Sequence, residues 1–208
     1  MRVTRNDAEL VNGIKLRDVS SFEEVFNRYS MKVLNLALRL TRNQQDAEEV
    51  VQDVFVCVFK KIDKFEGKSA FSSWLYRITV NTAFMKLRKK RYRDSLSIEE
   101  IPLQEKGAWL SYSAEDDASR NELAISLQLA ISKLPEEYRT IFILRDVDGL
   151  SNQEVGEVLH VSIPAVKSRL HRSRMLLRKR LLRVYEDYTS RQFKIENSDR
   201  EMEHQLMA

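Results

Sequence analysis

The chain has 208 residues, of which 43% are hydrophobic and 32% are charged, and its formal net charge at pH 7 is +4. That length suits one large or two small domains, and five glycines and three prolines leave few breaks between helices. The single cysteine excludes a disulfide framework and a cysteine-rich zinc site. No apolar run is long enough to span a bilayer, and the first residues lack the apolar core of a signal peptide, so we expect a cytoplasmic protein.

The first two predicted helices cover residues 21–40 and 45–62, where apolar residues recur at helical spacing. Ser21 and Glu24 match the S-x-x-E capping box and predict where the first helix begins. The second helix has an acidic face opposite its apolar one. That face carries Asp46, Glu49 and Asp53. A solvated helix face is the simplest interpretation, and docking to a basic partner surface is the functional alternative.

The third predicted helix covers residues 71–90, and it ends within a basic run at residues 86–93. A solvated helix end would explain this run, because cations are favourable at a helix C-terminus. Nearby aromatic residues favour contact with single-stranded nucleic acid, since an unstacked base needs an aromatic face. We expect Phe71, Trp74 and Phe84 to pack in the core instead. The nearby aromatic residues are Phe65, Phe71, Trp74, Tyr76, Phe84 and Tyr92.

Residues 94–119 lose apolar periodicity and carry seven acids but a single lysine. This composition predicts a flexible acidic linker. It separates a first domain, residues 20–93, from a second domain, residues 120–185, and a tail follows over residues 186–208. The sequence therefore predicts an all-α protein with two helical domains.

The strongest signal is a helix-turn-helix between residues 134 and 183. Ser151 and Glu154 form a second S-x-x-E capping box, and Ser162 can cap the next helix after a three-residue turn. That helix is rich in Lys and Arg and contains no acid, which is typical of a helix that binds phosphates and reaches base edges in a major groove. An ordinary bundle with a basic face is the structural alternative.

The sequence contains no motif that indicates catalysis or metal binding. The three histidines have no metal-ligand spacing, and no Gly-rich phosphate loop, Ser-His-Asp order or paired-carboxylate pattern occurs. We therefore expect no catalytic residue, metal, cofactor or small-molecule substrate.

With these motifs in view, residues 22–182 resemble the extracytoplasmic-function (ECF) class of bacterial sigma factors. Residues 46–55 (DAEEVVQDVF) resemble the helix of sigma region 2 that docks on the β′ clamp helices of RNA polymerase. Residues 65–82 (FEGKSAFSSWLYRITVNT) resemble the segment that recognises and melts the −10 promoter element. The second domain resembles region 4, which binds the −35 element and the β flap.

The resemblance implies roles for three sets of residues. The polymerase-binding set is Asp46, Glu49, Gln52 and Asp53. The set for the −10 element, where one base is flipped into a pocket, is Phe65, Lys68, Ser69, Ala70, Arg77, Asn81 and Arg88. The set for the −35 element is Ser162, Ala165, Lys167, Ser168, Arg169 and Arg172.

The resemblance also implies partners and a place in the cell. The chain is expected to bind core RNA polymerase and promoter DNA, both double- and single-stranded, and to start transcription at specific promoters. Members of the family are commonly held inactive by an anti-sigma factor, often at the inner face of the membrane. The alternatives are a stand-alone helix-turn-helix regulator, which leaves residues 65–82 without a role, and an enzyme acting on nucleic acid, which needs a metal or nucleophile site.

Overall fold

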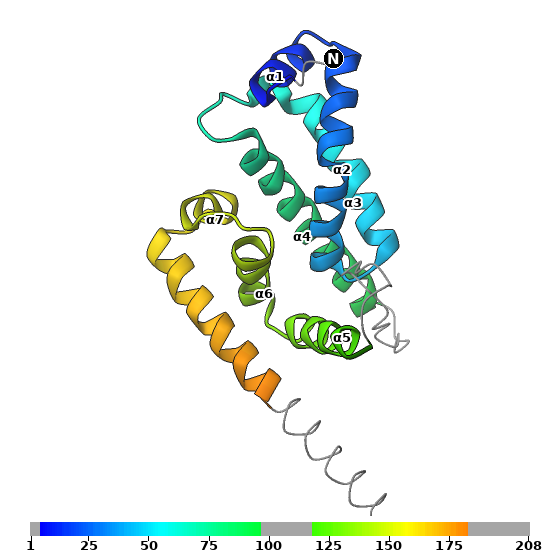
Figure 1. Ribbon diagram of the computed structural model, residues 1–208. Coiled ribbons are helices and arrows are strands. Elements are labelled where there is room, and N and C mark those ends of the chain that lie inside the picture. Colours follow the sequence, from blue (N-terminus) through cyan, green and yellow to red (C-terminus); the bar gives the residue numbers. More distant parts are fainter. Residues whose placement is uncertain (1–4, 97–117, 183–208) are drawn as a thin grey trace, which may run out of the picture. The chain divides into compact units, whose positions relative to one another are not determined.

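The computed structural model describes residues 5–96 and 118–182, and every regular element among them is helical (Figure 1). This confirms the all-α prediction. Most of the predicted linker, residues 97–117, and the predicted tail lie outside the described residues. None of the described helices is long and apolar enough to cross a membrane. The elements are α1 (Asp7–Lys15), α2 (Val19–Thr41), α3 (Gln44–Lys61), η1 (Ile62–Lys64), α4 (Phe71–Leu96), α5 (Ala118–Ser132), α6 (Glu136–Phe142), the π-helical turn η2 (Ile143–Val147), α7 (Asn152–Leu159) and a helix over residues 163–182.

Contacts between residues divide the chain into two compact units. Among the described residues, the first unit holds α1 to α4, η1, η2, α7 and the start of the last helix, up to Lys167. The second unit holds α5, α6 and the rest of the last helix, from Ser168. Each unit is described by itself below.

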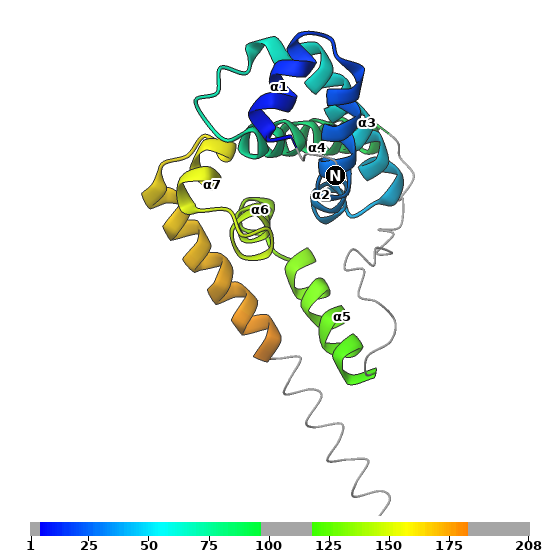
Figure 2. The same cartoon turned by 45° about the horizontal axis from the view of Figure 1, so that its top comes forward.

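The core of the first unit is a bundle of α2, α3 and α4. Figures 1 and 2 both show α2 and α3 side by side, and each of them also packs against α4. Their apolar residues meet at the predicted helical spacing, so the three predicted helices are confirmed. The fully buried core residues include Val25, Leu36, Leu40, Val50, Val54 and Leu75.

The predicted start of α2 was wrong. The helix begins at Val19, and its cap is Asp18, whose carboxylate accepts hydrogen bonds from the backbone amides of Ser20 and Ser21. Ser21 is therefore inside the first turn, where its hydroxyl donates to the same carboxylate at 2.6 Å. The hydrogen bonds that Asp18 accepts lower its pKa to about 2, and the bond from the Ser21 hydroxyl contributes most. Asp18 therefore caps the helix in place of the predicted Ser21.

Helix α1 precedes the predicted first domain and was not predicted. Its apolar residues Leu10 and Ile14 are fully buried against the bundle. Ionic contacts to α2 add to this packing, because Asp7 pairs with Arg28 at 2.7 Å. Asn6 caps the helix through a complete capping box. The first unit therefore extends to the N-terminal side of the residues expected to form it.

The first unit also includes α7, which lies against α4. Ser73 donates a hydrogen bond of 3.4 Å to Glu154, and Arg39 of α2 forms a largely buried ion pair with Asp148. Burial raises the pKa of Asp148, and the Arg39 guanidinium opposes that rise. Burial also raises the pKa of Tyr76, to about 12.

The second unit is held together around a buried arginine of α6. Arg139 donates hydrogen bonds to the carbonyl oxygens of Ser132 and Leu134, which lie at the end of α5 and in the turn after it. Arg180, in the last helix, donates to the carbonyl of Ala130 at 3.3 Å. These bonds satisfy carbonyls that the end of α5 would otherwise leave without a partner.

Candidate nucleic-acid and polymerase interfaces

Phe65 opens the loop predicted to capture a base, but its ring lies in the core. Only 9% of the residue is exposed, and its ring packs at 5.8 Å from Phe71 and 5.3 Å from Trp74, measured between ring centroids. The predicted core positions of Phe71 and Trp74 are confirmed. The ring of Phe65 therefore offers no face to a base in this structure, and the predicted role of Phe65 at the −10 element stays a prediction.

The rest of the loop, residues 66–70, lies at the surface. Lys68 and Ala70 are exposed, Ser69 is half-buried, and Lys68 pairs with Glu66. Gly67 has a φ of 73°, in the left-handed region that other residues avoid. The turn at Gly67 therefore projects the small and basic side chains that were predicted to contact the −10 element.

Helix α4 presents the other predicted −10 residues on one exposed stripe. Asn81 and Arg88 are seven residues apart, which places them on the same face, and both are exposed. Arg77, one turn before Asn81, is half-buried. Met85 lies between Asn81 and Arg88 and is 65% exposed. Met85 was not among the predicted site residues, although its helical spacing from Asn81 and Arg88 is visible in the sequence.

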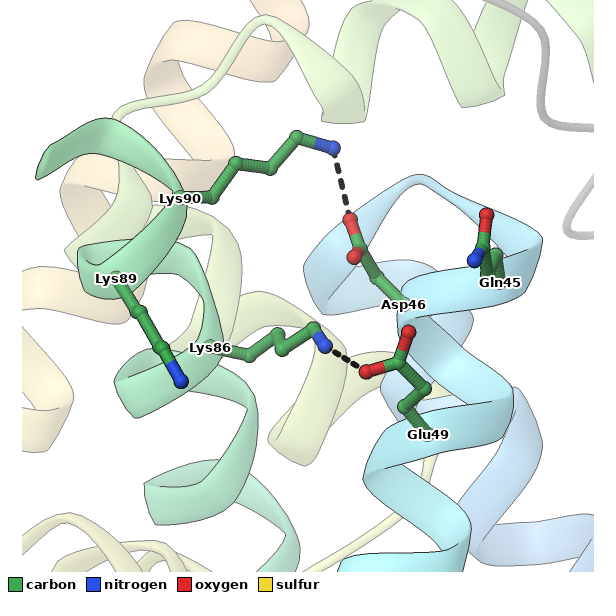
Figure 3. Close-up of a pocket in the computed structure, with 6 residues that line it drawn as sticks. All are labelled: Gln45, Asp46, Glu49, Lys86, Lys89 and Lys90. Carbon is green, nitrogen blue, oxygen red and sulfur yellow. Dashed lines mark hydrogen bonds and ion pairs between the residues drawn. The ribbon is translucent and has the colours of Figure 1, made fainter. Parts of the chain in front are cut away.

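The opposite, lysine-bearing face of α4 meets the acidic face of α3. Lys90 pairs with Asp46 at 2.9 Å, and Lys86 pairs with Glu49 (Figure 3). The two pairs line a pocket of about 400 Å³ whose other lining residues are Gln45 and Lys89. Two of the four residues predicted to bind polymerase are thus engaged by lysines of the same domain, and Asp46 is buried.

The other two predicted polymerase-binding residues, Gln52 and Asp53, are exposed on α3. Further along the helix, Val56 is 51% exposed and Phe59 is 42% exposed. Phe59 was expected on the buried face, but it packs edge-on against Phe22 at the rim of the core. An acidic and apolar surface therefore continues along α3, and the sequence pattern had shown only its acidic part.

The helix-turn-helix is built as the sequence predicted. Both halves of the capping box at Ser151 are present, since its hydroxyl accepts from the Glu154 amide and the Glu154 carboxylate accepts from the Ser151 amide. These bonds lower the pKa of Glu154, the backbone bond to Ser151 contributing most. Residues 160–162 form the turn, and the Ser162 hydroxyl accepts from the Ala165 amide at 3.4 Å.

Close packing of the turn requires a glycine within α7. A Cβ atom on Gly156 would lie 2.9 Å from the carbonyl oxygen of Val161, a distance that side-chain carbons do not adopt. The same turn places His160 in the left-handed region, with a φ of 55°. Gly156 and His160 therefore allow the chain to reverse tightly into the basic helix.

The basic helix over residues 163–182 has one buried and one exposed face. Its buried residues are Val166, Leu170, Ser173 and Leu177. Lys167, Ser168 and Arg172 are exposed, as is Ser162 just before the helix, while Ala165 is half-buried. The spacing of these residues gives a continuous exposed basic stripe, which fits the predicted groove-facing surface.

Arg169 differs from the other residues predicted to contact the −35 element. Its guanidinium lies 3.5 Å from the carboxylate of Glu137 in α6, within the second unit. The side chain is half-buried and directed toward a protein carboxylate. An ion pair of this length that solvent can reach is weak, so the pair does not prevent a phosphate from competing for Arg169.

Two family models match the chain. Residues 25–93 match the family model described as Sigma-70 region 2, and residues 124–177 match the one described as Sigma-70, region 4. The two matched ranges fall inside the two predicted domains. A stand-alone helix-turn-helix regulator would not account for the region 2 match.

Comparison with individual proteins gives the same class. The chain is 34% identical over 176 residues to the ECF RNA polymerase sigma factor SigW of Bacillus subtilis, covering 82% of this chain and 94% of that protein. Among solved structures it is similar to CnrH in complex with the cytosolic domain of CnrY, with a TM-score of 0.61 and 25% identity over 84% of this chain and 96% of that one. The sigma factor RpoE bound to the anti-sigma factor NepR, from Bartonella quintana, shares the fold at a TM-score of 0.60 and 24% identity, covering 78% and 98% of the two chains.

Proposed function

The chain belongs to the ECF sigma factors, transcription initiation factors that direct RNA polymerase to promoters, and from this premise we propose how its surfaces divide the work. The first domain docks on core polymerase and holds the melted −10 strand. The second domain binds the −35 element as duplex DNA. The chain itself makes and breaks no covalent bond and needs no cofactor.

The exposed loop and the outer stripe of α4 together form the proposed −10 surface. Duplex melting requires a protein group that holds a base once it has left the stack. The Asn81 amide offers both a donor and acceptors for the edge of such a base, and Arg88 offers charge to the backbone of the same strand. Arg77 supports the same strand. The exposed loop residues that contribute to the surface are Lys68, Ser69 and Ala70.

The exposed stripe of the last helix forms the proposed −35 surface. Arg172 can form two parallel hydrogen bonds to a guanine, whereas Lys167 acts as a point charge on phosphate or base. Pro164 and Ala165 bring no side-chain donor to the first turn of the helix, so sequence recognition there depends more on DNA shape and phosphates.

We assign polymerase docking to the acidic face of α3. Gln52 and Asp53 are exposed for direct contact, and Val56 and Phe59 extend that surface with apolar area. Asp46 and Glu49 contribute through their ion pairs, which set the charge of the neighbouring pocket. A surface with both acids and apolar side chains suits a partner that presents arginines among apolar residues.

The proposed setting is the cytoplasm, with an anti-sigma factor as a further partner. The similarity to RpoE, whose complex with an anti-sigma factor is known, supports that partner. The absence of a membrane-crossing helix among the described residues is in keeping with a cytoplasmic chain. An anti-sigma factor anchored in the membrane would hold the chain at its inner face.

The observation that carries the proposal is the exposure of Asn81 on α4, the helix that follows the loop of residues 66–70 and whose Lys86 and Lys90 pair with acids of α3. The test uses holoenzyme and a promoter that the wild-type holoenzyme selects from randomised DNA. Asn81→Ala should reduce permanganate reactivity of the −10 thymines while holoenzyme assembly is unchanged. A template with a premelted −10 region should restore the variant only in part, because base capture is still impaired.

The matched control is Asn12→Ala, which removes an exposed amide from α1. It should leave the permanganate pattern as in the wild type. Wild-type reactivity in Asn81→Ala would contradict the proposed −10 surface. Failure of the wild-type chain to assemble with core polymerase would contradict the proposal as a whole.

A further inference from the structure

Helix α1 lies outside the residues that match sigma region 2, which begin at Val25, yet it is firmly attached to the first unit. Leu10, Val11 and Ile14 are buried against the bundle. Arg5, just before the helix, donates to Glu24 of α2 at 3.0 Å. The helix is therefore a fixed platform, and the side chains at its C-terminal end have defined positions.

Two cations at that end bind the main chain next to the −10 loop. Lys15 donates a hydrogen bond of 2.8 Å from its ammonium to the carbonyl oxygen of Phe65. Arg17 donates at 3.1 Å to the carbonyl of Phe59, and it also reaches Asp63 at 3.3 Å. Together they hold the end of α3, the η1 turn and the first residue of the loop.

The carbonyl of Phe65 is the last fixed point before the exposed loop residues. The ring of Phe65 and its amide, which donates to Ile62 at 2.9 Å, anchor the residue from the protein side. At the other end of the loop, the carbonyl of Ala70 accepts from Trp74 as α4 begins. Lys15 thus supplies the one anchor, among those described, that comes to this loop from α1.

We propose that Lys15 is a positioning residue for the −10 loop: its ammonium fixes the Phe65 carbonyl and so holds residues 66–70 ready to receive an unpaired base. The inference rests on the proposed function of that loop. A charge-assisted hydrogen bond is stronger than a neutral one, and a loop ordered in advance spends less binding free energy on ordering itself. Helix α1 then belongs to the promoter-melting apparatus although it lies outside the matched domain.

The test compares Lys15→Met, Lys15→Arg and Arg5→Met in full-length chains assembled with core polymerase. The probe is a single-stranded oligonucleotide with the non-template −10 sequence of the selected promoter. Lys15→Met should weaken binding of this probe by about tenfold, the range for losing a hydrogen bond to a charged group. Lys15→Arg, which retains a cationic donor, should restore most of the affinity.

Arg5→Met is the control for a merely structural role, because it removes ionic contacts just before the N-terminal end of α1, away from the loop, while buried Leu10, Val11 and Ile14 still hold the helix and Lys15 in place. It should lower thermal stability at least as much as Lys15→Met but leave probe affinity unchanged. Amide hydrogen exchange over residues 66–70 should rise in Lys15→Met and stay low in Arg5→Met. Equal loss of probe affinity in both variants, or none in Lys15→Met, would overturn the inference.

Failure of the inference can be told apart from failure of the proposed function. Asn81→Ala and Lys68→Ala, assayed with the same oligonucleotide, report on the −10 surface directly. If they weaken binding while Lys15→Met does not, the −10 surface stands and the role of Lys15 is refuted. If all three bind as the wild type, both the proposed −10 surface and the role of Lys15 are refuted.

Discussion

Two helices of the chain are strongly basic, α4 and the helix over residues 163–182, and they differ in which of their cations form ion pairs. In α4, Lys86 and Lys90 are paired with acids of α3. In the helix over residues 163–182, the exposed cations Lys167 and Arg172 have no ion-pair partner among the described residues. Basic residues at similar density therefore give one helix whose lysines Lys86 and Lys90 are paired and one whose predicted groove-facing cations Lys167 and Arg172 are not, although Arg169 of the same helix pairs with Glu137.

This difference indicates which form of DNA each helix suits. Unpaired cations on one face favour duplex DNA, whose two strands concentrate phosphates along a groove. A helix with paired lysines gains less from phosphates and depends on groups that hold bases, such as Asn81 and the loop of residues 66–70. The pattern of ion pairs thus distinguishes a helix suited to duplex DNA from one suited to single-stranded DNA, which the basic composition of the two helices does not do.

The largest expected effect would sharpen the −10 side of this comparison. Phe65→Ala should lower the free energy of unfolding of the first domain by about 3 kcal/mol, because it removes a buried ring. Chemical denaturation followed by tryptophan fluorescence would measure it, since Trp74 contacts that ring. Lys68→Ala, at an exposed position of the same loop, should change stability by less than about 0.5 kcal/mol. A Phe65 variant as stable as the wild type would show that the ring is not part of the core.

The next effect concerns the unpaired helix. Arg172→Ala should weaken binding to the selected −35 duplex by about 1–3 kcal/mol, the usual range for a bidentate base contact. Competition binding against a scrambled duplex measures the specific part. Arg178→Ala is the matched control, because it removes an exposed cation further along the helix and should weaken both duplexes alike. Equal losses on both duplexes for Arg172→Ala would refute a base contact.

A smaller effect tests the cap that supports the recognition helix. Ser151→Ala should cost about 1 kcal/mol of stability at pH 7, the usual value for losing an N-cap. Gln153→Ala, an exposed change in the same helix, should cost less. Because folding lowers the pKa of Glu154, its contribution is complete above the ordinary value of 4.5 and disappears as the pH falls through the lowered value. Thermal melts should therefore show the stability that Glu154 contributes declining as the pH falls below 4.5, both in the wild type and in Ser151→Ala, whose backbone amide still donates to Glu154.

The smallest effect tests charge pairing itself. Glu49→Gln releases Lys86 and should raise the slope of non-specific duplex affinity against salt by about one unit, as for one added phosphate contact. Asp53→Asn removes the same charge from an exposed position of α3 and should change the slope less. Equal slopes in the two variants would mean that net charge, and not release of a lysine, governs binding.

Local signals made much of the fold predictable. The capping box at Ser151 and the three-residue turn lie within a few residues of each other, so the helix-turn-helix followed from sequence. At α2, two capping candidates lay close together, and only the structure shows that Asp18 is used in place of Ser21. Helix α1 escaped prediction because it is nine residues long and is held by distant partners such as Arg28.

The sequence allowed us to predict which residues belong to the candidate sites, but not which side chains contact one another there. Lys86 and Glu49 are 37 residues apart, and no local pattern reveals that they meet. An aromatic residue beside a basic run has the same pattern whether its ring is buried or exposed, so the core position of Phe65 could not be foreseen. The contact of Lys15 with a main-chain carbonyl leaves no trace in the sequence at all.

The most direct test of the proposed division is a crossed binding measurement on holoenzymes carrying Asn81→Ala or Arg172→Ala. Each is titrated with a −35 duplex and with a single-stranded −10 oligonucleotide from the selected promoter. The account predicts that Asn81→Ala loses affinity for the single strand alone and that Arg172→Ala loses it for the duplex alone. Loss of both probes in either variant, at unchanged affinity for core polymerase, would contradict the separation of the two binding modes.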